Sequence, residues 1–63
     1  MFRWYWTISR WYNGVLRIWE STIGKFSERA NMNDASDYYT HLMNEGDIRD
    51  NDEVDIQFEL RRD

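Results

Sequence analysis

The dipeptide Asn13-Gly14 constrains the fold of this chain more than any other feature of its sequence. Both residues accept positive φ, as the two central positions of a type I′ turn require, and β-branched and aromatic residues flank them on both sides. A two-residue turn at this point predicts a β-hairpin. Its register gives the pairs Tyr12–Val15, Trp11–Leu16, Ile8–Trp19 and Trp4–Ile23.

Side chains alternate along strands, so this register assigns each hairpin residue to one of two faces. The register also sets Arg10 opposite Arg17, and like charges in that position cost about a few tenths of a kcal/mol. We therefore expect a bulge or a nearby carboxylate between these arginines. One face is predicted to hold Phe2, Trp4, Trp6, Ile8, Tyr12, Val15 and Trp19. The other is predicted to hold Arg3, Tyr5, Thr7, Ser9, Trp11, Leu16, Ile18 and Glu20.

A helix is predicted downstream, capped by Asn33 or Asp34 and ended by Gly46 at the first position beyond it. Its apolar residues follow the i, i+3, i+4, i+7, i+8 spacing of a one-sided amphipathic helix. They are Ala35, Tyr38, Tyr39, Leu42 and Met43.

A half-buried strand is predicted near the C-terminus, where apolar and polar residues alternate strictly. Val54, Ile56, Phe58 and Leu60 share one face, and Asp55, Gln57, Glu59 and Arg61 share the other. The segment Ile23–Met32 is ambiguous, because Phe26, Glu28, Ala30 and Met32 also alternate, so a third strand there is an open alternative.

These elements predict one α+β domain over residues 1–63, with the order ββ(β)αβ: a small antiparallel sheet with one helix packed on one face. A seven-residue repeat allows a coiled coil as an alternative. Its three similar triplets are Arg3-Trp4-Tyr5, Arg10-Trp11-Tyr12 and Arg17-Ile18-Trp19. Gly14 and the β-branched residues favour the hairpin.

The composition favours an ordered, soluble protein of a reducing compartment. Cysteine is absent, which removes disulfides and thiolate metal sites. The N-terminus lacks the pattern of a secretory signal, and no stretch reaches the roughly 18 apolar residues of a membrane span. We expect a cytoplasmic protein, in the cytoplasm of the host cell if the chain is viral.

Residues typical of catalysis are scarce, so the sequence predicts that the protein is not an enzyme and has no cofactor or metal site. The single histidine, His41, falls on the polar side of the predicted helix. Three isolated glycines match no phosphate-binding loop. The acidic stretch Asp47–Asp55 fails the calcium-loop spacing, because a loop counted from Asp50 has Val54 at the third ligand position and Asp55 at the glycine position.

Charge and aromatic residues are separated along the chain. Residues 1–33 hold all four tryptophans and five basic residues against two acids, whereas residues 34–63 hold ten acids against three arginines. One helix covers one face of a sheet, so the face that bears Tyr5, Trp11, Leu16 and Ile18 is predicted to remain open as a hydrophobic patch. A single negative surface is expected from Asp37, Glu45, Asp47, Asp50, Asp52, Glu53, Asp55 and Glu59.

These features favour a protein-binding module that occludes a basic surface on a larger protein. Apolar anchors would supply binding energy, and the carboxylates would supply encounter rate and register. The partner-binding residues are predicted to be Tyr5, Trp11, Leu16, Ile18, Asp47, Asp50, Asp52, Glu53, Asp55 and Glu59.

In size, charge and order of elements, the chain resembles the small host-takeover and anti-defence inhibitors made by phages. This resemblance implies an inhibitor, and it carries over no binding residues. Two other functions stay open. One is binding of single-stranded nucleic acid by the aromatic and arginine-rich hairpin, which the net charge of −4 disfavours. The other is a self-associating module, with a homodimer as the partner. A role at a membrane is not expected, because the acidic half repels anionic lipid.

Overall fold

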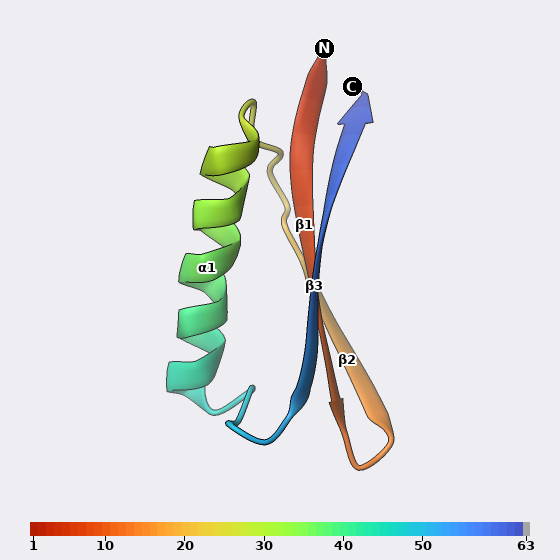
Figure 1. Cartoon of the computed structure of the whole chain (residues 1–63), viewed down its shortest axis with the longest axis vertical. Coiled ribbons are helices and arrows are strands. Elements are labelled where there is room, and N and C mark those ends of the chain that lie inside the picture. Colours follow the sequence, from red (N-terminus) through yellow and green to blue (C-terminus); the bar gives the residue numbers. More distant parts are fainter. Residues whose placement is uncertain (63) are drawn as a thin grey trace.

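The computed structural model describes residues 1–62 and has the predicted α+β architecture. Strands β1 (Phe2–Tyr12), β2 (Val15–Glu20) and β3 (Glu53–Arg62) form one antiparallel sheet in the order β2-β1-β3. Helix α1 (Glu28–Glu45) lies along one side of this twisted sheet (Figure 1). Both termini lie at the end of the molecule opposite the hairpin turn. The longest strand, β1, is thus the centre of the sheet.

The hairpin turn is the predicted one. Asn13 has φ 50° and Gly14 has φ 77°, as a type I′ turn requires. The pairs Tyr12–Val15, Trp11–Leu16 and Ile8–Trp19 are all present, which confirms the two predicted faces of the hairpin.

The predicted pair Trp4–Ile23 is wrong, because β2 ends at Glu20. Trp6 N donates to the hydroxyl of Ser21, 3.1 Å away, in place of a backbone carbonyl. Two residues are then looped out of register, and Trp4 exchanges two backbone hydrogen bonds with Lys25 instead. A side-chain acceptor therefore shifts the pairing beyond Glu20.

The helix begins earlier than predicted, so the predicted cap at Asn33 or Asp34 is wrong. Ser27 is the N-cap, and its hydroxyl accepts a hydrogen bond from Ala30 N at 3.1 Å. The alternative of a third strand within Ile23–Met32 is also wrong, because α1 starts at Glu28 and only an isolated bridge precedes it. The end of the helix is as predicted: Gly46 adopts the left-handed conformation, with φ 80°.

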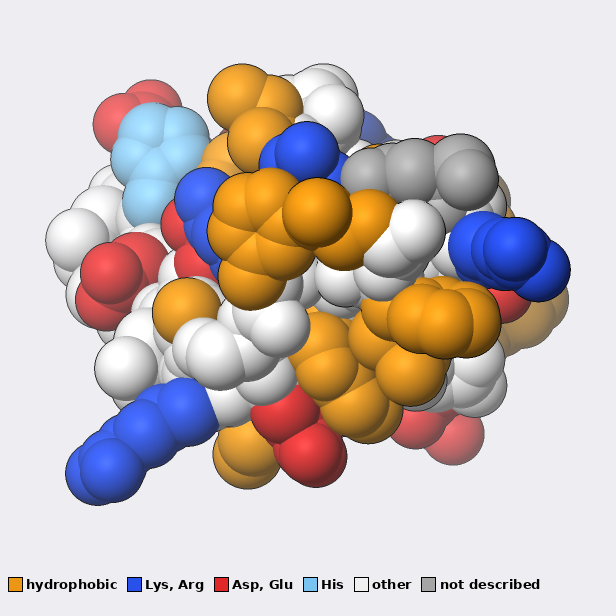
Figure 2. Space-filling model, turned by 90° about the horizontal axis from the view of Figure 1, so that it is seen from above, with side chains coloured by type: hydrophobic (Ala, Val, Ile, Leu, Met, Phe, Trp, Pro, Cys, Tyr) orange, Lys and Arg blue, Asp and Glu red, His pale blue; other side chains and the backbone are white. Residues whose placement is uncertain are grey.

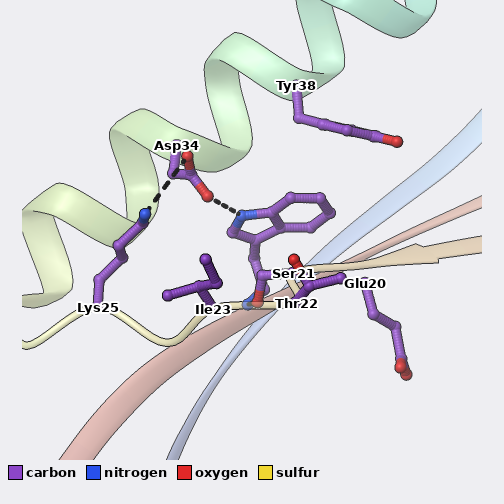
Figure 3. Close-up of a pocket in the computed structure, with 8 residues that line it drawn as sticks. Glu20, Ser21, Thr22, Ile23, Lys25, Asp34 and Tyr38 are labelled. Carbon is purple, nitrogen blue, oxygen red and sulfur yellow. Dashed lines mark hydrogen bonds and ion pairs between the residues drawn. The ribbon is translucent and has the colours of Figure 1, made fainter.

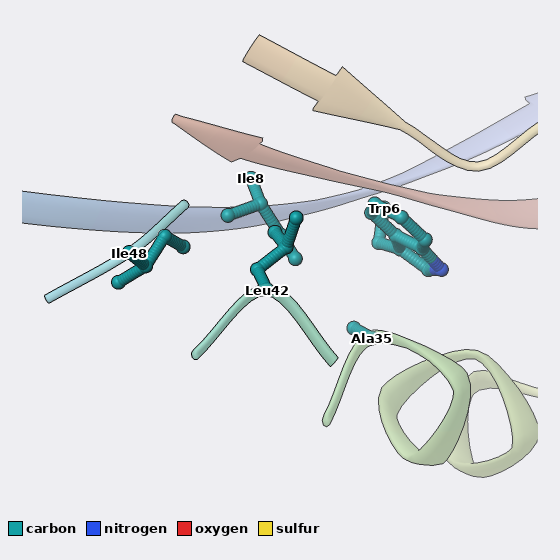
Figure 4. Packing of buried hydrophobic residues seen from close by; sticks show 5 residues of the cluster. All are labelled: Trp6, Ile8, Ala35, Leu42 and Ile48. Carbon is teal, nitrogen blue, oxygen red and sulfur yellow. The ribbon is translucent and has the colours of Figure 1, made fainter. Parts of the chain in front are cut away.

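The core lies between the centre of the sheet and α1. Trp6 and Ile8 of β1 are buried against Ala35 and Leu42 of the helix and against Ile48 of the following loop (Figure 4). Trp19, Tyr39, Met43 and Val54 pack around this cluster and are partly buried. Burial of this apolar surface is the main driving force for folding.

The helix leaves part of β3 uncovered. Ile56, Phe58 and Leu60 lie on the helix side of the sheet, opposite Ile8, Trp6 and Trp4, yet they are 37, 39 and 47% exposed. Seen from the end with both termini, hydrophobic side chains are also exposed at several places (Figure 2). One helix therefore shelters the middle of its face and not the β3 edge.

The like-charged pair Arg10–Arg17 forms, and a carboxylate relieves it as expected. Asp47, in the loop after α1, accepts from Arg17 Nη1 at 3.0 Å through Oδ1 and from Arg10 Nη1 at 2.6 Å through its backbone carbonyl. One loop residue therefore ties the hairpin to the end of the helix.

We expect Asp47→Asn to lower the free energy of unfolding by about 0.5–1 kcal/mol, because the half-exposed ion pair is lost while the two arginines stay opposed. Urea denaturation at low salt measures this effect. Asp50→Asn is the control, since Asp50 is exposed in the same loop. The difference in free energy of unfolding between the two variants should shrink in about 1 M NaCl. An equal loss of this free energy in both variants would contradict a stabilising role for Asp47 between the two arginines.

Asn31 is fully buried on the sheet side of α1, and neither polar atom of its amide has a hydrogen-bond partner among the described residues. We expect Asn31→Leu to raise the free energy of unfolding by about 1–3 kcal/mol, because the cost of burying an unpaired amide is removed. Thermal unfolding of this variant and of the control Asn33→Leu, exposed on the same helix, tests it. A destabilised Asn31→Leu would show that the amide serves the fold.

Candidate functional site

The face of the sheet turned away from α1 is the candidate site, and we refer to it as the open face. Cross-strand pairing arranges it in rows, and the rows that include β2 hold one residue from each of the three strands. The rows nearest the hairpin turn are Glu53–Trp11–Leu16, Asp55–Ser9–Ile18 and Gln57–Thr7–Glu20. Towards the termini follow the pairs Glu59–Tyr5 and Arg61–Arg3.

Three of the predicted anchors form an exposed apolar patch on this face. Trp11 and Leu16 are direct cross-strand neighbours, and Ile18 lies in the next row on the same strand as Leu16. Their exposed fractions are 45, 41 and 51%. We call Trp11, Leu16 and Ile18 the apolar patch; contiguous exposed apolar residues of this kind mark interaction sites more often than isolated ones do.

The fourth predicted anchor, Tyr5, lies apart from the apolar patch. It is three rows away from Trp11 and only partly exposed. The guanidinium of Arg61 stacks over its ring at 4.5 Å. On its other flank the loop before α1 brings Gly24 so close that a Cβ at that position would lie 2.7 Å from Tyr5 Cζ. Tyr5 therefore packs against its own chain.

Carboxylates lie beside the apolar patch on β3. Glu53 is the direct neighbour of Trp11, and Asp55 is the neighbour of Ser9 one row further along. Both are exposed. Asp55 accepts a hydrogen bond from Gln57 at 2.9 Å. The patch thus has an acidic border along one side.

Glu59 contributes less negative charge to this border, because it forms an ion pair with Arg61 at 2.9 Å on the same strand. This hydrogen bond with Glu59 raises the pKa of Arg61 above its usual value. The pair has no net charge and lies next to Tyr5, away from the apolar patch.

The remaining predicted acids do not join the others in one negative surface. Asp47 is engaged with Arg10 and Arg17, whose side chains lie on the helix side of the sheet. Asp52 accepts a hydrogen bond from Arg49 N within its own turn, and Asp50 is exposed in that turn. Asp37 and Glu45 belong to α1, on the opposite side of the sheet from Asp55. The topology divides the acids between two faces and a loop.

Arginines of the chain stack on its own aromatic rings. Arg17 lies 4.8 Å from the Trp19 ring centroid, and Arg49 lies 4.6 Å from that of Tyr12. Arg3 lies over Phe26 and Arg61 over Tyr5 in the same way. Rings and guanidinium groups held by one another are less available to the bases and phosphates of a nucleic acid.

A second feature, an open cleft of about 310 Å³, lies between α1 and the loop that follows β2. Asp34 of α1 lines it: Asp34 accepts a hydrogen bond from Trp6 Nε1 at 2.8 Å and lies 3.9 Å from Lys25 Nζ (Figure 3). Ser21, Ile23 and Tyr38 also line it. The sequence suggested Asp34 only as a helix cap. Its role as acceptor for a buried indole depends on the earlier start of α1, which no local pattern indicated.

No match to this chain was found among protein-family models, curated proteins or solved structures. Within residues 1–62, no group of three or more acidic or histidine side chains is arranged to hold a metal ion. His41 is exposed on α1, as predicted, with its ring 5.7 Å from that of Tyr38. Over the same range, no helix combines the length and apolar character that crossing a bilayer requires. The assignment of a site therefore depends on the geometry of the open face.

We expect Gly24→Ala to lower the free energy of unfolding by about 1–3 kcal/mol, because the new methyl would overlap Arg3 Cβ and the Tyr5 ring. Thermal unfolding measures it, with Thr22→Ala as the control in the same loop at an exposed position. Equal stability of the two variants would mean that Tyr5 is free of the loop and belongs with the other anchors.

Proposed function

We propose that this chain is a non-enzymatic protein-binding module that docks its open face on a larger protein and blocks a basic surface there. The supporting observation is the pairing of two kinds of group in adjacent rows. An exposed apolar patch of Trp11, Leu16 and Ile18 lies directly beside the carboxylates of Glu53 and Asp55.

The apolar patch would supply most of the binding energy. Energetically dominant interface residues are often aromatic, central and surrounded by contacts that exclude water. Trp11 is the aromatic residue of the patch, and it lies on the central strand with Leu16 on one side and Glu53 on the other.

The carboxylates would select a basic partner. Glu53 and Asp55 form no ion pair among the described residues, and the whole chain has a net charge of −4. Unpaired acids at the border of an apolar patch accelerate encounter with a positive surface and disfavour acidic competitors. The chain itself would act by occupying the surface, as a small inhibitor of the host-takeover or anti-defence kind does.

A comparison of baits tests this proposal. Tagged wild-type protein and the variants Trp11→Ser, Ile18→Ser and Glu53→Gln would be used to capture proteins from a lysate of the cells that produce the chain. We expect one protein with a basic surface to be retained by the wild type. We expect its dissociation constant, measured by calorimetry, to rise about tenfold or more with Trp11→Ser. Glu53→Gln should weaken binding at low salt and reduce its salt dependence.

Matched controls distinguish binding through the open face from nonspecific hydrophobic or electrostatic binding. Ile23→Ser removes a more exposed isoleucine from the loop before α1, and Asp37→Asn removes a charge from the outer side of the helix. Both should bind as the wild type does. If Ile18→Ser and Ile23→Ser have the same effect, the open face is not the binding surface.

A further inference from the structure

The outer edge of β3 is a second surface that the fold leaves without a neighbour. Among the described residues, this ten-residue strand pairs with β1 alone, at one edge of the sheet order β2-β1-β3. Ile56, Phe58 and Leu60 of this strand are also partly uncovered on the helix side. A long edge strand with an apolar face is a template for pairing with another strand.

We propose that the occupant of this edge is a second copy of the same chain, paired antiparallel through β3. Phe58 of one copy would lie directly opposite Phe58 of the other, and we call this the register centred on Phe58. The result would be a six-stranded sheet with a two-fold axis, in which each copy offers the same surface. This inference is distinct from the proposed function, because the apolar patch lies on β1 and β2 and stays exposed in such a dimer, and Asp55 is the one residue that both proposals use.

Charge complementarity on the open face favours the register centred on Phe58. In this register Asp55 of one copy lies opposite Arg61 of the other, and the pair occurs twice by symmetry. Gln57 lies opposite Glu59, which allows an amide-to-carboxylate hydrogen bond. Opposite charges in such cross-strand positions stabilise pairing.

Neighbouring two-fold registers place like charges opposite one another. Centring on Gln57 sets Asp55 against Glu59 twice, which offsets its two Glu53–Arg61 pairs, and centring on Glu59 sets that carboxylate against its own copy. Centring on Ile56 sets Glu53 against Glu59. Among the described residues of β3, the register centred on Phe58 therefore opposes no like charges, whereas each of these three registers does.

The apolar side of β3 fits the same arrangement. Phe58 would meet Phe58 of the second copy, and Ile56 would meet Leu60. Both helices would lie on the same side of the enlarged sheet, because residues that lie directly opposite one another in an antiparallel pair point to the same face of the sheet. The two β1 strands, each beneath its helix, would be about 14 Å apart, three strand spacings of about 4.8 Å. Helices pack at about 8–10 Å, so this spacing avoids a clash and leaves room for the β3 side chains between them.

A charge-exchange experiment tests the pairing and its register. Sedimentation of the wild type over about 1–500 µM should show a concentration-dependent transition from 7.8 kDa to twice that mass. Asp55→Arg should raise the dimer dissociation constant about tenfold or more, because two attractive pairs become repulsive. The double variant Asp55→Arg with Arg61→Asp restores opposite charges and should return the constant to within about threefold of the wild type.

Controls guard against effects on folding. Arg29→Asp and Asp37→Arg make the same charge changes on exposed positions of α1 and should leave the dimer unchanged. Arg61→Asp also removes the contacts with Tyr5 and Glu59, so each variant is checked by circular dichroism. Asp55→Arg removes only the hydrogen bond with Gln57 and remains informative if Arg61→Asp is unfolded.

A wild type that stays monomeric at about 500 µM overturns the proposal and leaves the β3 edge for a strand of a different protein. A dimer that survives Asp55→Arg unchanged, or a double variant that stays monomeric while folded, also overturns the register centred on Phe58. Trp11→Ser should leave the dimer intact. Loss of partner binding by Trp11→Ser and loss of the dimer by Asp55→Arg are therefore separate outcomes.

Discussion

Packing of one 18-residue helix on a three-stranded sheet is the interaction on which the rest of this structure depends. The helix lies over β1, where Trp6 and Ile8 meet Ala35 and Leu42, and this contact closes the core. A helix is about 10 Å wide and three strands span about the same distance or more, so its width does not shelter a whole sheet face. The uncovered apolar area on β3 follows from this mismatch, and the open face is uncovered because α1 lies on the other side of the sheet.

Electrostatic contacts attach the periphery to that core. Asp47 holds Arg10 and Arg17 of the hairpin near the end of α1, while Asp34 joins the indole of Trp6 to the helix. Arginines that lie over aromatic rings cover part of the exposed aromatic surface without a second layer of structure. In a chain of 63 residues, these contacts fix the positions of elements that one small core leaves loosely held.

Elements that depend on residues close together in the chain could be predicted from the sequence. Asn13-Gly14 gave the hairpin and its register, because the turn geometry sets which residues pair. The alternation from Val54 to Leu60 gave β3, and Gly46 gave the end of α1. The start of α1 was not readable, since buried Asn31 interrupts the apolar periodicity and Ser27 competes with Asn33 and Asp34 as a cap. Of the candidate site, Trp11, Leu16 and Ile18 followed directly from the hairpin register.

The sequence by itself determined the hairpin, the C-terminal strand and the apolar patch, because each depends on turn geometry or on alternation between near neighbours. Only the tertiary structure decided that β3 pairs with β1 and not with β2, and hence that Glu53 and Asp55 border the patch while Asp47 lies with the arginines on the helix side. It also decided that Tyr5 is covered by the loop at Gly24. These outcomes depend on contacts between residues far apart in the chain, which the local pattern of neither partner specifies.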